Sequence, residues 1–147
     1  MKQTRKGFFE TNSSSTHSIS LGGDDLESII HMLRPQFPGI QEGDTEYTIN
    51  LAGYVFGWEI ETYNDAEIKL AYALLDYAPD YQIVQDVFKE ITGVELVVKM
   101  SEYDNNGYTG YIDHQSRGTA TELSREELIN FIFNPHSELH TDNDNHQ

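Results

Sequence analysis

The chain has 147 residues, of which 25 are acidic and 9 are basic, and it contains no cysteine. This length predicts one domain, and the lack of cysteine excludes disulfide frameworks, thiolate zinc sites and cysteine nucleophiles. The formal net charge of −16 disfavours direct binding to nucleic acid or to an anionic membrane surface. It is compatible with simple solubility or with attraction to a basic partner.

The beginning of the chain is basic but is not followed by an apolar segment, so we expect no signal peptide. No apolar run approaches the roughly 18 residues that a membrane helix needs. We therefore predict a cytoplasmic protein that does not associate with a membrane.

The first predicted strand covers residues 15–21, where apolar and polar side chains alternate after a run of hydroxyl residues. A short helix is expected next, with Asp24 or Asp25 as its N-cap and Pro35 ending it. Apolar and polar residues alternate in residues 46–51 and 54–60, and an Ala-Gly pair typical of turns separates the two segments, so we predict an antiparallel hairpin.

Two helices are predicted in the middle of the chain. Asn64 and Glu67 have the spacing of a capping box at the start of the first helix. The apolar residues of this helix surround it almost completely, which predicts that it is buried. The second helix covers residues 83–91 and should end at Gly93, because glycine readily adopts the left-handed conformation found after helices.

The sequence from residue 94 to residue 134 predicts a second hairpin followed by a final helix. Residues 94–100 are rich in β-branched side chains, and residues 108–114 are expected to return antiparallel to them. The last helix should begin at the capping box of Ser124 and Glu127 and end at Asn134.

The predicted fold is a single α+β domain, residues 1–147, with about five mostly antiparallel strands and about four helices packed on the sheet. Residues 135–147 are predominantly polar. We expect them to form a flexible tail, because chain ends are commonly poorly ordered.

Hydroxyl and amide side chains dominate one short stretch, and these residues, with Ser116 later in the chain, are the predicted ligand-binding set: Asn12, Ser13, Ser14, Ser15, Thr16 and Ser18. Such residues can bond nearby backbone groups and build a tight turn. Alternatively, they can form a concave site for a phosphate or another anion. The stretch lacks the glycines and lysine of a Walker loop.

His17 follows the hydroxyl run, and Asp113 and His114 lie at the end of a predicted strand. A single histidine on a strand is more often a packing residue than a catalyst. If Asp113 or His114 meets His17 in space, however, the three side chains could perform acid–base catalysis.

The polar end of the chain contains Asp142 and Asp144, whose oxygen ligands suit a hard divalent cation. The spacing is that of the start of an EF-hand loop, but the glycine and the distal glutamate of that loop cannot follow. The alternative is a polar tail with no metal.

Three segments together, residues 9–18, residues 111–116 and residues 130–135 leading to residues 141–145, resemble a group of small uncharacterised proteins of bacteriophages and prophages. The resemblance implies no established activity. It implies a phage setting, and thus the cytoplasm of a bacterial host, where small acidic proteins commonly act on host machinery. It also suggests that the three polar segments form one site.

The leading hypothesis is therefore a phage-type accessory protein whose Ser/His/Asp pocket binds a small phosphate-bearing or other anionic ligand. Whether such a pocket would hydrolyse the ligand or only bind it is left open by the sequence. The alternative is a non-enzymatic acidic protein that uses exposed Tyr or Trp residues to bind and inhibit a host protein. A homodimer is compatible with either hypothesis.

Overall fold

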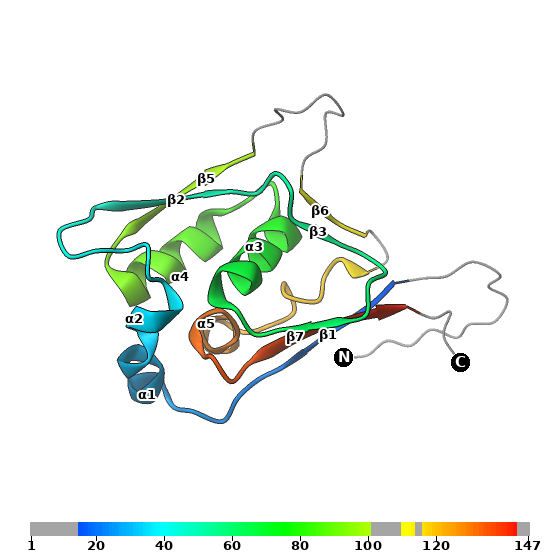
Figure 1. Cartoon of the computed structure of the whole chain (residues 1–147), viewed down its shortest axis with the longest axis horizontal. Helices are drawn as coiled ribbons and strands as arrows, with labels where there is room; N and C mark the ends of the chain where they lie inside the picture. The colour runs from blue at the N-terminus through cyan, green and yellow to red at the C-terminus, as the bar shows by residue number, and fades with distance from the viewer. Residues whose placement is uncertain (1–14, 101–109, 114–115, 144–147) are drawn as a thin grey trace, which may run out of the picture.

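The computed structural model describes residues 15–100, 110–113 and 116–143, which fold into seven strands and five helices (Figure 1). The mixture of helices and sheets is the predicted α+β class. Strands surround three central helices on several sides in the view of Figure 1. They form three short sheets with the orders β1-β7-β4, β2-β5 and β3-β6, where β1 is Ser15–Ser20.

Residues 46–63 form one bent, extended path that contributes a strand to each of the three sheets. The strands are β2 (Glu46–Asn50), β3 (Val55–Phe56) and β4 (Glu61–Tyr63). β2 pairs parallel with β5 (Glu95–Lys99), β3 pairs parallel with β6 (Tyr111–Ile112), and β4 pairs antiparallel with β7 (Glu138–Asn143). The path therefore changes its partner at two bends.

The predicted hairpin between residues 46–51 and 54–60 is wrong, because these segments follow one another along the same path. At the bend, Gly53 has a φ of 95° and the Tyr54 amide donates to the Leu51 carbonyl at 3.1 Å. The Ala-Gly pair turns the chain without reversing it. Gly110, which directly precedes β6, lies close to this bend. A Cβ added to Gly110 would lie only 2.1 Å from the Leu51 carbonyl oxygen.

The predicted antiparallel pairing of residues 94–100 with residues 108–114 is also wrong for the described part of these segments. β5 lies parallel to β2, and the connection between them contains two helices, α3 (Ala66–Tyr77) and α4 (Gln82–Thr92). Parallel strands require such a crossover. The predicted hairpin also needs a turn between the two segments, and residues 101–109 lie outside the described residues.

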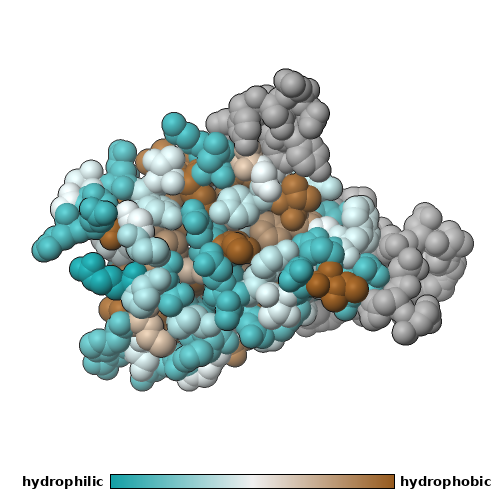
Figure 2. Space-filling model, viewed as in Figure 1, coloured by the Kyte–Doolittle hydropathy of each residue, from teal (hydrophilic) through white to brown (hydrophobic). Residues whose placement is uncertain are grey.

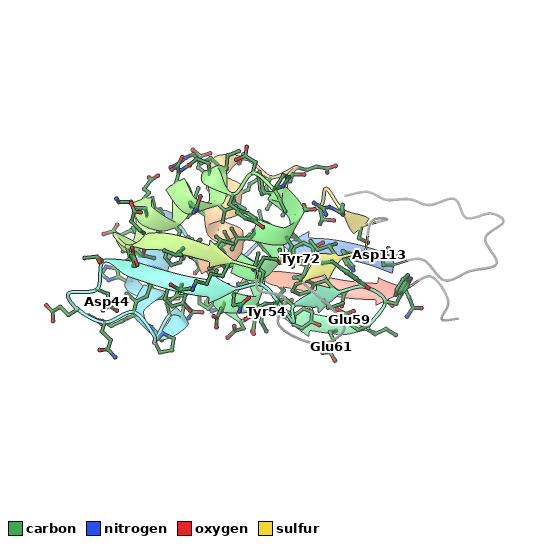
Figure 3. The ribbon with its side chains drawn as sticks, turned by 90° about the horizontal axis from the view of Figure 1, so that it is seen from above. Asp44, Tyr54, Glu59, Glu61, Tyr72 and Asp113 are labelled. Atoms are coloured by element: carbon green, nitrogen blue, oxygen red, sulfur yellow. The ribbon has the colours of Figure 1, made fainter. Side chains whose placement is uncertain are left out.

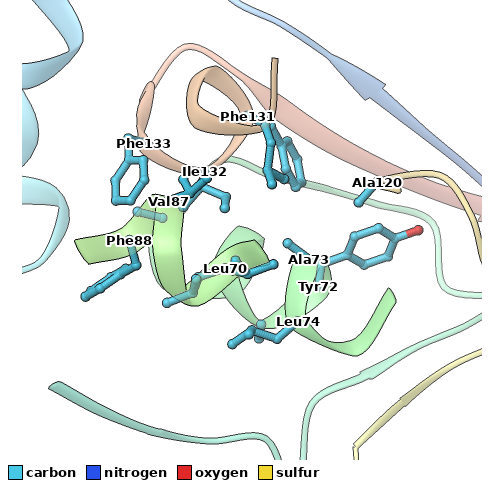
Figure 4. Packing of buried hydrophobic residues seen from close by; sticks show 14 of the residues in the cluster. Leu70, Tyr72, Ala73, Leu74, Val87, Phe88, Ala120, Phe131, Ile132 and Phe133 are labelled. Carbon is cyan, nitrogen blue, oxygen red and sulfur yellow. The ribbon is translucent and has the colours of Figure 1, made fainter. Parts of the chain in front are cut away.

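The core lies where α3, α4 and α5 (Arg125–Phe133) meet (Figure 4). Four large side chains of the core are completely buried: Leu70 and Leu74 of α3, Phe88 of α4 and Phe133 of α5. As predicted, α3 is buried around most of its circumference. Its tyrosine, Tyr72, is also fully buried, and in Figure 4 the hydroxyl end of the side chain points away from the Leu70 and Phe88 side of the cluster.

Several predicted helix ends are confirmed. Gly93 ends α4 with a φ of 79°, and Ser124 and Glu127 form both hydrogen bonds of the capping box of α5. The N-cap of α3 is Asp65 and not Asn64: the Asp65 carboxylate accepts from the Ile68 amide at 3.2 Å. Local rules thus identify these three ends to within one residue.

The first helical segment is divided into α1 (Leu26–His31) and α2 (Leu33–Gln36), and Asp25 is the N-cap of α1. Pro35, which we expected to end the helix, lies inside α2. Proline is tolerated there because the amides of a first helical turn have no intrahelical partner.

The expectation of a flexible tail is wrong for residues 138–143. They form β7, which lies between β1 and β4. Its register pairs Ser15 with Asn143 and Ile19 with Leu139, and Leu139 is completely buried. The polar composition of the segment concealed a strand whose alternate residues face the core.

Lys69 in α3 determines how the chain passes from α5 into β7. Its side chain is fully buried, and Nζ donates to the carbonyl oxygens of Asn134 at 2.7 Å and Ser137 at 2.8 Å. Burial lowers the pKa of Lys69 to about 8. A neutral amine still has two N–H groups, one for each carbonyl, so loss of the proton leaves both hydrogen bonds in place.

Replacing Lys69 by methionine should change how stability depends on pH. Between pH 8 and 9.5 the unfolded chain retains the lysine proton and the folded protein loses it. The wild-type free energy of unfolding should therefore rise by up to about 1.4 kcal/mol per pH unit. Lys69→Met should lack this rise, whereas Lys99→Met, which alters an exposed lysine, should retain it. Denaturant unfolding at pH 8 and pH 9.5 measures the free energies. If the wild type and Lys69→Met gain the same stability between these pH values, Lys69 does not have a lowered pKa in the folded protein.

Candidate functional site

Polar residues from distant parts of the chain meet beneath β1, and we call this group the buried polar cluster: Ser15, His17, Tyr72, Asp113 and Ser116. Each of the five is at most 8% exposed. Ser15 and His17 share the inward face of β1, because alternate residues of a strand point to the same side. The first and second of the three polar segments therefore lie in contact.

A chain of hydrogen bonds joins the two serines to the aspartate. Ser15 Oγ donates to Asp113 Oδ2 at 2.7 Å and lies 2.7 Å from Ser116 Oγ. A hydroxyl has one hydrogen, so Ser116 must be the donor to Ser15. The backbone fixes Asp113 as well: its amide donates to the Phe56 carbonyl at 2.8 Å.

His17 joins β1 to α3 and to the bent path. Its Nε2 lies 2.8 Å from the Gly57 carbonyl oxygen, and its Nδ1 lies 3.0 Å from the Tyr72 hydroxyl. A carbonyl can only accept, so Nε2 carries the hydrogen and Nδ1 of the neutral ring accepts from Tyr72. Burial lowers the pKa of His17 below its ordinary value, which favours this neutral form at physiological pH.

This geometry does not support the hypothesis that His17 is an acid–base catalyst, since both ring nitrogens are engaged inside the protein. It agrees with the alternative, a histidine that packs and orients its neighbours. His114 lies outside the described residues, so its meeting with His17 stays a prediction. Asp113, the third member of the hypothetical catalytic set, is bonded to Ser15.

The loop that carries Ser116 is fixed on the end of α3. The Asp76 carboxylate accepts from the amides of Gly118 at 2.7 Å, Ala120 at 2.8 Å and Thr121 at 3.1 Å. The Arg117 guanidinium in turn donates to the carbonyl of Leu75 at 3.0 Å. The sequence analysis did not identify Asp76 and Arg117, which hold the helix and the loop together from both sides. A carboxylate in the last turn of a helix, where the dipole disfavours it, was the signal that could have revealed the pair.

The described part of the cluster is poorly suited to an anion. The Asp113 carboxylate lies within it, and Arg117, next to Ser116 in the chain, is directed to carbonyl oxygens of α3. Asn12, Ser13 and Ser14 lie outside the described residues. The predicted anion pocket therefore gains no support from the residues that the structure describes.

Thr16 and Ser18 belong to the opposite, outward face of β1. They line a pocket of about 370 Å³ together with residues of β4 and β7, among them Glu61, Thr62, His140 and Asp142. His140 lies between the strands, with Nε2 2.8 Å from Ser20 Oγ and Nδ1 3.2 Å from Thr62 Oγ1. The predicted ligand set is thus divided between two sides of one strand.

The third polar segment also reaches this place, because Thr16 is paired with Asp142 in the register of β1 and β7. Asp142 Oδ1 accepts from the Asn143 amide at 2.7 Å. Among residues 15–100, 110–113 and 116–143, no group of three or more acidic, histidine or cysteine side chains could hold a metal ion. Asp144 is not among those residues, so the cation site of Asp142 and Asp144 stays a prediction without support.

The second bend of the path, residues 57–60, lies between β3 and β4, and we call it the Trp58 loop. Two large apolar side chains of this loop face solvent: Trp58 is 44% exposed and Ile60 is 62% exposed. The predicted strand over residues 54–60 would have placed both side chains on one face of a sheet. The bend removes them from the sheet and from its alternation.

Hydrogen bonds from several directions fix the Trp58 loop. The Glu59 carboxylate accepts from the Gly57 amide at 2.9 Å and from the Tyr63 hydroxyl at 3.1 Å. The Trp58 carbonyl accepts from Asn143 Nδ2 at 2.9 Å. With the bond from His17 to Gly57, the backbone of the loop is held at Gly57 and Trp58, and the Glu59 side chain joins the loop to Tyr63. Its exposed side chains therefore project from an ordered backbone.

Figure 3 places the loop within the molecule. Glu59 and Glu61 lie toward the same end as Asp113, whereas Asp44 lies at the opposite end. The buried polar cluster, the Trp58 loop and the pocket on the outward face of β1 are therefore parts of one end of the protein.

Comparison with known proteins found no family model, no curated protein and no solved structure that matches this chain. The geometry and chemistry of the residues are therefore the basis for inferring function.

Replacement of His17 should alter stability on the acidic side. As pH falls below about 6.5, the unfolded chain binds a proton that the folded protein excludes, so the wild type should lose up to about 1.4 kcal/mol per pH unit. His17→Gln should be roughly 1–3 kcal/mol less stable at pH 7.5 because buried hydrogen bonds are lost. It should also show a smaller loss between pH 7.5 and 5.5.

The control is His31→Gln, which changes an exposed histidine of α1 and should keep the wild-type pH dependence. Denaturant unfolding at both pH values is the measurement. If His17→Gln loses as much stability on acidification as the wild type, His17 is not the buried neutral group described above.

Proposed function

We propose that this chain is a non-enzymatic acidic protein that binds a basic surface of a partner protein through the Trp58 loop, and so blocks that surface. In the phage setting implied by the resemblance, the partner is a host protein. The observation that carries the proposal is the pair of solvent-facing side chains, Trp58 and Ile60, on a backbone fixed from within the fold.

An ordered loop binds at lower entropic cost than one that must be ordered on contact. The hydrogen bonds of Glu59 and His17 supply that order in the free protein. Tryptophan is among the residues that most often dominate binding energy at interfaces. Trp58 is the single tryptophan of the chain, and its exposure is unusual for so large an apolar side chain.

The charge near the loop favours a basic partner. Glu61 and Asp142 line the pocket beside Ile60, and the described residues of its lining include no lysine or arginine. Elsewhere, Lys89 and Arg125 are paired with acidic side chains, and Lys69 is buried. The formal net charge of −16 makes the protein strongly acidic overall, which would accelerate encounter with a positive surface and select against acidic partners.

On the face drawn in Figure 2, hydrophilic residues predominate and hydrophobic ones appear as separate spots. No helix in the described part of the chain is both long and apolar enough to cross a bilayer. A small apolar centre within acidic surroundings supports binding to a basic surface that has its own apolar patch.

Trp58 fluorescence can test this proposal with an oligoarginine peptide as the probe. At low salt the peptide should change the Trp58 emission, and affinity should fall as salt is added. Ile60→Ala should weaken binding by about 5-fold or more, a difference of roughly 1 kcal/mol. Glu61→Lys should weaken it by a similar factor.

Matched controls exist elsewhere on the surface. Ile83→Ala alters an aliphatic side chain that is 45% exposed on α4, and Glu122→Lys reverses an exposed charge outside the pocket. Both should bind the peptide nearly as the wild type does. If the controls weaken binding as much as Ile60→Ala and Glu61→Lys, the attraction is a diffuse property of net charge, and the proposed site is wrong.

A further inference from the structure

A second pocket lies between α1, α2, the loop of residues 37–44 and the junction of α4 with β5, with a volume of about 540 Å³. Apolar side chains form much of it, including Ile30, Leu33, Phe37 and Ile40. Ile30 is 45% exposed, so part of the apolar lining is uncovered. This volume is within the range of about 300–1,000 Å³ that is usual for small-molecule sites.

Arg34 contributes to this pocket and differs from most of the lysines and arginines that the structure describes. Its guanidinium makes no hydrogen bond or ion pair within the part of the chain that the structure describes. By contrast, Lys89 and Arg125 have carboxylate partners, and Arg117 donates to backbone carbonyls. In a chain of net charge −16, an arginine without a partner beside an apolar pocket has its donors available for a ligand.

We propose that this cavity, the Arg34 pocket, binds a small amphiphilic anion, a compact apolar or aromatic body that bears one negatively charged group. The apolar body would contact Leu33, Phe37 and Ile40, and the charged group would accept hydrogen bonds from Arg34. An arginine presents a planar fork of donors that matches a carboxylate, sulfonate or phosphate.

Acidic side chains limit the charge of the ligand. Glu42 and Asp44 also line the pocket, and Asp44 Oδ2 already accepts from the Gln41 amide at 2.7 Å. Their negative charge would oppose a multiply charged anion more strongly than a singly charged one. At physiological salt the charges farther away are largely screened, because the Debye length is about 8 Å.

The Arg34 pocket is independent of the proposed protein-binding site. Asp44, one of its lining residues, lies at the opposite end of the molecule from Glu59 and Glu61 (Figure 3). Failure of one proposal therefore leaves the other intact.

Two fluorescent probes of similar shape test the proposal. 8-Anilinonaphthalene-1-sulfonate carries one negative charge, and N-phenyl-1-naphthylamine is its uncharged counterpart. The wild type should bind the sulfonate with enhanced emission at one site. Arg34→Gln should weaken sulfonate binding about 10-fold or more, the factor expected for one charge-assisted hydrogen bond, and should leave binding of the uncharged probe within about 2-fold.

Two further variants complete the design. Lys99→Gln removes an exposed cation from β5, outside the pocket, and should change neither affinity. Ile30→Ser alters an exposed lining residue and should weaken both probes. The proposal is overturned if the folded wild type does not bind the sulfonate, if Arg34→Gln binds it as well as the wild type does, or if Lys99→Gln weakens it equally.

Discussion

The arrangement of this protein depends on a neutral imidazole held between two partners. His17 donates from Nε2 to the Gly57 carbonyl and accepts at Nδ1 from the Tyr72 hydroxyl. Through these bonds the first described strand is joined to the main buried helix and to the bend of the path that supplies all three sheets. A protonated ring would add a charge in a place where burial already lowers the pKa, so the neutral form is part of the fold.

The same bonds connect the interior to the surface. Because the bend at Gly57 is fixed from beneath, Trp58 and Ile60 lie outside the sheet on an ordered backbone. A buried histidine that appeared in the sequence as a catalytic candidate thereby has an indirect role, which is to position a loop. The acidic residues beside that loop then give the proposed interaction its preference for a basic partner.

Local features of the fold could be predicted from the sequence, and pairings could not. The capping box of Ser124 and the left-handed Gly93 depend on residues a few positions apart, so short patterns suffice. The parallel pairing of β2 with β5 and the polar strand β7 depend on distant partners. The alternation of the predicted strand 15–21 implies that Thr16 and Ser18 face away from Ser15 and His17, but it does not reveal that Ser15 meets Asp113 or that Thr16 pairs with Asp142.

The tautomer and titration of His17, followed by nitrogen-15 NMR of the imidazole, test the central claim most directly. A neutral ring protonated at Nε2 should persist when the pH is lowered to 6.5, the ordinary pKa of a histidine, because burial lowers the pKa of His17. A His17 ring that carries its hydrogen on Nδ1, or that is mainly charged at pH 6.5, would contradict the account.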